Sequence, residues 1–111
     1  MGKDKRDKNM GELYALLKNE IFSLGNNVTE HIEQADWRHL RKNGKTFTYV
    51  RLARKKLAIH LKANSAQVYD PQFVLQKGYT SYGNMKVRLD LHNEAELGYT
   101  MQLIKQVYDL N

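Results

Sequence analysis

Residues 46–62, TFTYVRLARKKLAIHLK, decide the fold of this chain. The first seven residues are rich in β-branched and aromatic side chains, which is typical of a β-strand. Further on, Leu57, Ile59 and Leu61 alternate with less apolar residues, which predicts a half-buried second strand. Residues 53–56 (ARKK), three of them basic, lie between the two and predict a turn, so the strands are expected to pair as an antiparallel hairpin.

A second turn precedes this hairpin. The Asn-Gly pair in residues 42–45 (KNGK) suits a type I′ turn, which joins two antiparallel strands. The residues before it, from Trp37 to Arg41, predict a further strand, so three consecutive strands form a meander. Residues 28–34 mix β-branched side chains with Glu and His, and their secondary structure stays ambiguous.

The C-terminal half adds one more strand. In residues 85–91 an apolar residue alternates with a charged one, which predicts a strand with one inner face. Residues 63–81 form the longest irregular stretch, in which residues 73–75 are expected to reach the core.

Apolar residues at helical spacing predict one helix at each end of the chain. The first, residues 10–24, begins after a capping-box pair of Asn9 and Glu12, and the second covers residues 94–109. The apolar positions that carry these predictions are Leu13, Leu16, Leu17, Ile21 and Leu24, then Leu97, Met101, Ile104 and Tyr108.

The expected fold is therefore α+β, in the order α-β-β-β-β-α. The simplest packing is a two-layer domain, in which both terminal helices cover one face of a four-stranded antiparallel sheet. Residues 1–8 (MGKDKRDK) alternate in charge and are expected to be a disordered tail, and residues 9–111 a single domain.

Composition excludes several classes of protein. The chain has no cysteine, which excludes disulfides, thiolate metal sites and cysteine nucleophiles. No apolar run approaches the roughly 20 residues that span a bilayer, and the N-terminus has no signal-peptide pattern. We therefore expect a cytoplasmic protein that does not contact membranes.

Half of the positive charge lies in one acid-free window. The sequence has 18 Lys and Arg, and nine of them fall between Asp36 and Asp70, where no acidic residue occurs. Outside the window, the other nine stand against all 12 acidic residues. A localised positive field attracts a polyanion such as nucleic acid. The nine residues are Arg38, Arg41, Lys42, Lys45, Arg51, Arg54, Lys55, Lys56 and Lys62.

We expect these cations to contact nucleic-acid backbone without base specificity. The basic turns at residues 41–45 and 53–56 lie at opposite ends of one strand, about 20 Å apart or slightly more. Tyr79 and Tyr82 lie in a polar, glycine-bounded loop and are candidates for stacking on bases. The alternative interpretation is a solvated sheet face whose lysines keep the protein soluble and protect an edge strand.

Nothing in the sequence predicts catalysis. The four histidines lack metal-ligand spacing, and the central strands lack the clustered carboxylates that a metal-dependent nuclease needs. The motifs of serine hydrolases and of P-loop proteins are absent. The prediction is a non-catalytic protein with no cofactor and no metal.

Several segments together resemble the bacterial domain-of-unknown-function family number 5655, whose members are often labelled "predicted transport protein". The resemblance runs from about Leu13 to the end, with matching order and spacing. It rests on residues 45–47 (KTF), 55–62 (KKLAIHLK), Asp70-Pro71, 78–84 (GYTSYGN) and 99–108 (YTMQLIKQVY). Family members stand alone or form the C-terminal domain of larger proteins, some of them similar to restriction endonucleases.

The resemblance implies an accessory domain in a DNA-related setting. The family loop usually reads Gly-His-x-Gly-x-Gly-Asp, whereas Tyr79 and Asn84 stand here at the His and Asp positions, which argues against acid-base or metal chemistry. Arg51 stands where members often carry an acidic residue, so this chain is more basic. The alternative function is a protein-protein interaction or dimerisation domain of a larger DNA-associated or defence-related system. A third hypothesis is a small-molecule or phospho-ligand site between residues 70–84 and the sheet.

Overall fold

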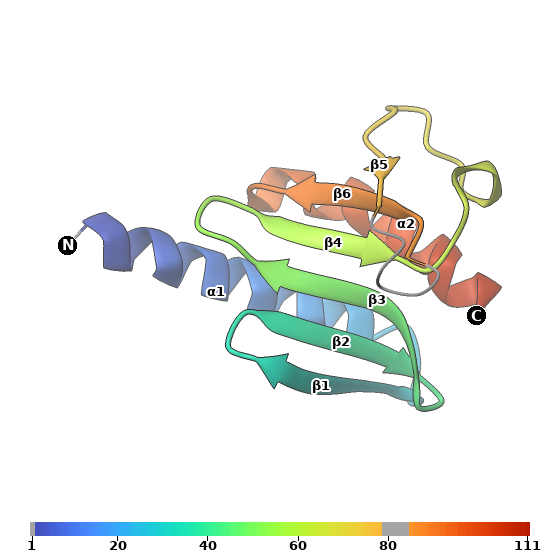
Figure 1. The fold of residues 1–111 in the computed structure, drawn as a ribbon, viewed down its shortest axis with the longest axis horizontal. Coiled ribbons are helices and arrows are strands. Elements are labelled where there is room, and N and C mark those ends of the chain that lie inside the picture. Colours follow the sequence, from blue (N-terminus) through green and yellow to red (C-terminus); the bar gives the residue numbers. More distant parts are fainter. Residues whose placement is uncertain (1, 79–84) are drawn as a thin grey trace.

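The computed structural model describes residues 2–78 and 85–111 and has two layers, a sheet and a pair of helices (Figure 1). The helices are α1 (Gly2–Phe22) and α2 (Leu97–Leu110), with short 3₁₀ segments η1 (Ser65–Gln67) and η3 (Glu94–Glu96). The strands are β1 (Val28–Gln34), β2 (Trp37–Lys42), β3 (Lys45–Leu52), β4 (Leu57–Leu61), β5 (Gln76–Lys77) and β6 (Val87–Leu91). Both long helices lie behind the sheet in this view, so the helices cover one face of the sheet; the opposite face, which no long helix covers, is called the open face below.

The α+β class, the terminal helices and the antiparallel sheet are confirmed, but the expected number of strands is wrong. Within the described residues the sheet has six strands, in the order β1-β2-β3-β4-β6-β5, and every pair is antiparallel. The four predicted strands are β2, β3, β4 and β6. The two additional strands are the edges of the sheet, where few side chains are buried: β1 buries only Val28, and both residues of β5 are exposed. Strands with so little buried surface leave no apolar alternation in the sequence.

Helix α2 agrees with its prediction to within a few residues, whereas α1 starts at Gly2, earlier than the predicted start near residue 10. The division of the chain into a tail (1–8) and a domain (9–111) stays a prediction. In the described part of the chain, no helix is long and apolar enough to cross a membrane.

The core lies between the helices and the covered face of the sheet. Its fully buried side chains come from both helices and from the four inner strands. They include Leu17 and Ile21 of α1, Leu103, Ile104 and Val107 of α2, and Leu40, Phe47, Val50, Leu57, Ile59, Leu61 and Leu91 of the sheet.

Gly25 lies against the Tyr108 side chain of α2. A Cβ atom at this position would lie 2.2 Å from the Tyr108 hydroxyl oxygen, so any other residue would displace the end of the Tyr108 side chain. That hydroxyl donates a hydrogen bond to Asn27 Oδ1 at 2.8 Å, so the connection between α1 and β1 is fixed against α2. Asn43 (54°) and Gly44 (81°) have positive φ angles, as the predicted type I′ turn between β2 and β3 requires.

A β-bulge in β3 changes which face of the sheet the side chains of the β2–β3 hairpin point to. Leu40 pairs with Thr48, but the next residue of β2, Arg41, pairs with Thr46, so Phe47 is the additional residue. Phe47 and Thr48 are both fully buried, and the Phe47 ring packs edge-on against Tyr108 of α2, with ring centroids 5.6 Å apart. Two successive side chains therefore face the helices.

The bulge leaves a buried hydroxyl group unsatisfied, which predicts a stabilising substitution. Thr48 Oγ1 has no hydrogen-bond partner within the described residues. We expect Thr48→Val to raise the free energy of unfolding by about 1 kcal/mol, because valine has the same shape and removes the desolvated hydroxyl. Urea unfolding measures this difference. The matched control is Thr46→Val, which removes a hydroxyl that contacts His39 Nδ1 at 3.1 Å and should be neutral or destabilising. Destabilisation by Thr48→Val would contradict the prediction.

Candidate nucleic-acid interface on the open sheet face

Strand register separates the residues of the basic window into two groups. Leu40 pairs with Thr48, which pairs with Leu61, and all three are fully buried against the helices. Since side chains alternate along a strand, their neighbours point to the open face. The open face therefore carries Trp37, His39 and Arg41 from β2, Tyr49 and Arg51 from β3, Ala58 and His60 from β4, and Arg88 and Asp90 from β6.

A row of aromatic and imidazole rings crosses the middle of this face. The Tyr49 ring is central, with ring centroids 4.1 Å from His39, 4.7 Å from Trp37 and 6.4 Å from His60. His31 of β1 extends the row, 5.5 Å from His39. Trp37 and His39 are half-buried and His31 is exposed, so the rings form a partly accessible surface.

Glu33 fixes the orientation of this row. Its Oε1 lies 2.6 Å from His39 Nε2 and accepts a hydrogen bond from the Tyr49 hydroxyl. These hydrogen bonds, first from Tyr49 and then from His39, hold the pKa of the Glu33 carboxyl below its ordinary value. The carboxylate is thus engaged by the rings of two neighbouring strands.

Six of the nine predicted cations lie on the open face, at the two ends of β3 or directly after β4. Arg51 places its guanidinium 5.8 Å from the Trp37 ring centroid, a cation–π distance. Arg54 and Lys55 are exposed in the β3–β4 turn, and Lys45 is exposed at the opposite end of β3. Among the described side chains, none of the six forms an ion pair with an acid. The six are Arg41, Lys45, Arg51, Arg54, Lys55 and Lys62.

Arg38 and Lys42 do not join this group, because both lie on the helix side of β2. Arg38 donates hydrogen bonds to backbone carbonyls, the shortest to Ala35 at 2.8 Å, and lies 3.9 Å from a Glu30 carboxylate oxygen. Lys42 donates to the backbone carbonyl of Tyr108 at 2.8 Å, near the C-terminal end of α2, and its Nζ lies 4.0 Å from the Tyr108 ring centroid. Both cations are therefore engaged within the fold.

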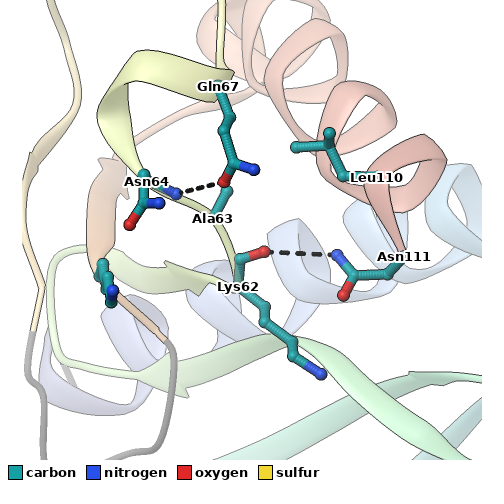
Figure 2. A pocket seen from close by; sticks show the side chains of 7 residues that line it. Lys62, Ala63, Asn64, Gln67, Leu110 and Asn111 are labelled. Atoms are coloured by element: carbon teal, nitrogen blue, oxygen red, sulfur yellow. Dashed lines mark hydrogen bonds between the residues drawn. The ribbon is translucent and has the colours of Figure 1, made fainter.

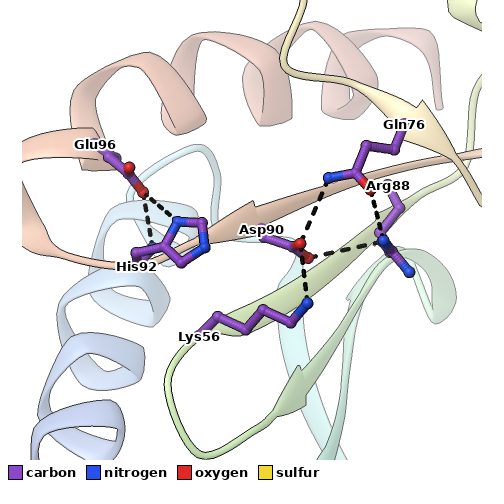
Figure 3. Close-up of polar contacts among 6 residues, drawn as sticks. All are labelled: Lys56, Gln76, Arg88, Asp90, His92 and Glu96. Atoms are coloured by element: carbon purple, nitrogen blue, oxygen red, sulfur yellow. Dashed lines mark hydrogen bonds and ion pairs between the residues drawn. The ribbon is translucent and has the colours of Figure 1, made fainter.

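Lys56, the ninth cation, is neutralised by Asp90 (Figure 3). Lys56 Nζ lies 3.1 Å from Asp90 Oδ2, and Arg88 Nε lies 3.7 Å from the other carboxylate oxygen. Arg88 also donates to Gln76 Oε1 at 2.6 Å, which joins β5 to β6. Arg88 was not among the predicted binding residues, although its place in the charged alternation of residues 85–91 indicates that it points outward.

His60 is buried among charged side chains on the open face. Its side chain is 1% exposed, and burial, reinforced by Arg88 and Arg51, lowers its pKa from 6.5 to about 4, against an opposing effect of Asp90. The imidazole is therefore neutral near pH 7. Two arginines on this face disfavour a further positive charge, as expected for a surface of positive potential.

Lys62 lies at the end of β4 beside a cavity of about 270 Å³ (Figure 2). Lys86, Asn64 and Gln67 contribute to its lining, together with Asn111, whose side-chain amide donates to the Lys62 carbonyl at 3.3 Å. Two lysines and several amide groups make this cavity polar and basic. Lys62 and Lys86 thus add positive charge beyond the end of β4.

Tyr79 and Tyr82, the predicted stacking residues, lie outside the described residues. Among the side chains that the structure describes, no group of three His, Cys, Asp or Glu is arranged to hold a metal ion. Of the four histidines, His39 and His60 lie on one face of the sheet, with Tyr49 between them. Comparison of the chain with protein-family models, curated proteins and solved structures finds no match, so the resemblance to domain family 5655 stays a prediction.

Proposed function

We propose that this domain binds nucleic-acid backbone through the open face of its sheet, without catalysis and without base specificity. The observation that carries the proposal is that the cations of the basic window differ in their partners according to where they lie. The cations that have ion-pair or carbonyl partners lie on the helix side or beside Asp90, whereas Arg41, Arg51, Arg54 and Lys55 have no acidic partner among the described side chains.

The spacing of these cations suits an extended polyanion. Strand β3 has eight residues and is therefore about 26 Å long, with Lys45 at one end and Arg54 and Lys55 just beyond the other. Duplex DNA rises about 3.4 Å per base pair, so the two ends of β3 span roughly eight base pairs or a comparable length of single strand. Phosphate groups along that length can meet cations at both turns and on the face between them.

The ring row favours a single strand over a duplex. Single-stranded nucleic acid combines backbone charge with accessible base faces, and partly accessible rings beside arginines offer both electrostatic and stacking contacts. Trp37, with Arg51 against its ring, and His39 are half-buried rings, and His31 is exposed.

The experiment is a salt titration of binding. With roughly five phosphate contacts formed and the corresponding counterions released, we expect affinity between about 50 and 200 mM salt to fall about a hundredfold for labelled single-stranded DNA and roughly 500-fold for duplex DNA. Arg51→Glu and Arg54→Glu should each weaken binding at low salt and reduce the salt slope by about one. Fluorescence anisotropy at several salt concentrations measures both quantities.

The matched control is Lys105→Glu, which makes the same change of net charge on an exposed position of α2, behind the sheet. It also breaks the ion pair of Lys105 with Asp109, but both side chains are more than half exposed, so this pair contributes little to stability. Lys56 is left unchanged, because its reversal would also break the contact with Asp90. Absence of binding at low salt would end the proposal. An equal loss in the control and in the open-face variants would show that net charge, and not this face, determines binding.

A further inference from the structure

The loop between η1 and β5 carries the two most exposed aromatic side chains among the described residues. Tyr69 is 77% exposed and Phe73 is 88% exposed. The expectation that residues 73–75 reach the core is therefore wrong for Phe73, whereas Val74 and Leu75 do pack against it. The loop packs on α2: the Gln106 side chain accepts a hydrogen bond from the Tyr69 amide at 2.7 Å and donates one to the Tyr69 carbonyl at 3.0 Å. It therefore lies at the β5 end of the strand order, whereas the ring row lies on β1 to β4.

The loop is held in one conformation by Asp70 and Tyr99. The Asp70 carboxylate accepts hydrogen bonds from the Leu75 amide at 2.9 Å and from the Tyr99 hydroxyl, which in turn accepts one from the Gln72 amide at 3.0 Å. Burial by itself raises the pKa of the Asp70 carboxyl, but the hydrogen bonds from Tyr99 and from backbone amides of residues 73–75 outweigh it and hold the pKa below its ordinary value. The carboxylate thus orders the tip of the loop.

Phe73 occupies a strained backbone conformation at this tip. Its φ angle is 55°, in the left-handed region that a bulky residue rarely adopts. Such strain persists only where surrounding contacts impose it, and it is found preferentially at functional positions. Here the contacts of Asp70 hold a phenylalanine in solvent, which costs free energy twice, once in backbone strain and once in exposed apolar surface.

A cavity of about 370 Å³ opens beside Phe73. The residues on either side of Phe73, Gln72 and Val74, line it, together with side chains of β6, η3 and α2. Its apolar wall consists of Val74, Leu89, Ala95 and the ring of Tyr99. An apolar cavity of about 150 Å³ already accommodates benzene, so this one is large enough for a phenyl ring.

The charged groups of this cavity are already engaged (Figure 3). Asp90 is bound by Lys56 and Arg88, as described above. Glu96 accepts a hydrogen bond from the His92 amide at 2.8 Å and lies 3.2 Å from His92 Nδ1. With both carboxylates occupied, the cavity is better suited to an apolar group than to a cation.

We infer that the occupant of the cavity is Phe73 of a second copy of this chain. A two-fold symmetric interface requires one surface that carries both a projecting group and the cavity that receives it. Phe73 and the cavity lined by its neighbours meet this requirement, because each copy would insert its phenyl ring into the other. The result is a homodimer whose interface lies at the β5 edge of the sheet, whereas the ring row lies on β1 to β4.

Sedimentation equilibrium of the full chain, from micromolar to millimolar concentration, tests the inference. We expect a concentration-dependent dimer. Phe73→Asn removes the ring while keeping a residue that tolerates positive φ, and it should weaken dimerisation about 30-fold, as truncation of a central anchor does. Ala95→Trp fills the cavity from the exposed segment η3 and should weaken dimerisation similarly.

Mixing the two variants separates insertion from a general loss of structure. The Phe73→Asn chain keeps its cavity and the Ala95→Trp chain keeps its ring, so an equimolar mixture should form more dimer than either variant alone. The matched control is Ile32→Asn, which removes a 56% exposed apolar side chain at the opposite edge of the sheet, on β1, and should leave the dimer intact. A monomer at every concentration would overturn the inference, as would a dimer that only Ile32→Asn dissociates. Neither outcome depends on nucleic-acid binding.

Discussion

Replacing Phe47 with alanine is expected to lower the free energy of unfolding by about 3–5 kcal/mol. The ring is fully buried, belongs to the central core and packs edge-on against Tyr108 of α2. Its removal leaves a cavity at the bulge of β3, where the backbone is fixed by pairing on both sides, so the site cannot collapse to fill the space. The loss includes both the transfer of the ring and the cavity that remains.

The Phe47 ring also helps to hold the β2–β3 hairpin against α2. Phe47 and Lys42 both contact Tyr108, so the bulge, the hairpin and the end of α2 form one packed unit. Chemical unfolding followed by far-ultraviolet circular dichroism measures the change in stability. The control, Phe22→Ala, removes a phenylalanine that is 40% exposed at the end of α1 and should cost about 1 kcal/mol or less. Equal losses in the two variants would contradict the role assigned to the bulge.

Acidification is expected to remove about 3 kcal/mol of stability through His60 alone. Its pKa is about 4 in the folded protein and about 6.5 when the chain is unfolded. Between these two values the unfolded chain binds a proton at His60 and the folded protein does not, so falling pH favours unfolding. The contribution is fully present above pH 6.5 and is lost as the pH falls to about 4.

Urea unfolding at successive pH values from 7 to 4 measures this dependence, and His60→Gln provides the comparison. The variant lacks the titrating group and should lose less stability over the same range, although it can be less stable at pH 7. Asp70 and Glu33, whose pKa values are held below their ordinary values, add to acid sensitivity in both proteins and cancel in the difference. Parallel pH profiles for the two proteins would show that His60 is not buried as a neutral group.

Local sequence patterns predicted most of the elements that form the core. The alternation of Leu57, Ile59 and Leu61 and the helical spacing in residues 97–108 both require a buried face, and a side chain that is removed from water leaves a periodic signal. The Asn43-Gly44 turn was predictable for a different reason, since both residues tolerate positive φ. Strand β1 left no such signal, because its pairing depends on the neighbouring strand and its side chains are mostly exposed.

The sequence showed which cations could form the candidate site, but it did not show how they are arranged in space. The acid-free window identified the nine cations, but simple alternation along residues 46–52 would place Phe47 on the same side as Tyr49 and Arg51. The bulge moves Phe47 to the core, and the partners of Arg38, Lys42 and Lys56 come from residues far away in the sequence.

By itself, the sequence determined where helices and inner strands form and how much positive charge the central strands carry, because these properties depend on residues close together in the chain. Only the tertiary structure decided which cations have acidic or carbonyl partners, that the rings of Trp37, His39 and Tyr49 gather on one face, and that Phe73 projects beside a cavity. Those outcomes depend on strand register, on one bulge and on contacts between distant segments, and a shift of one residue in register would move every side chain of a strand to the other face.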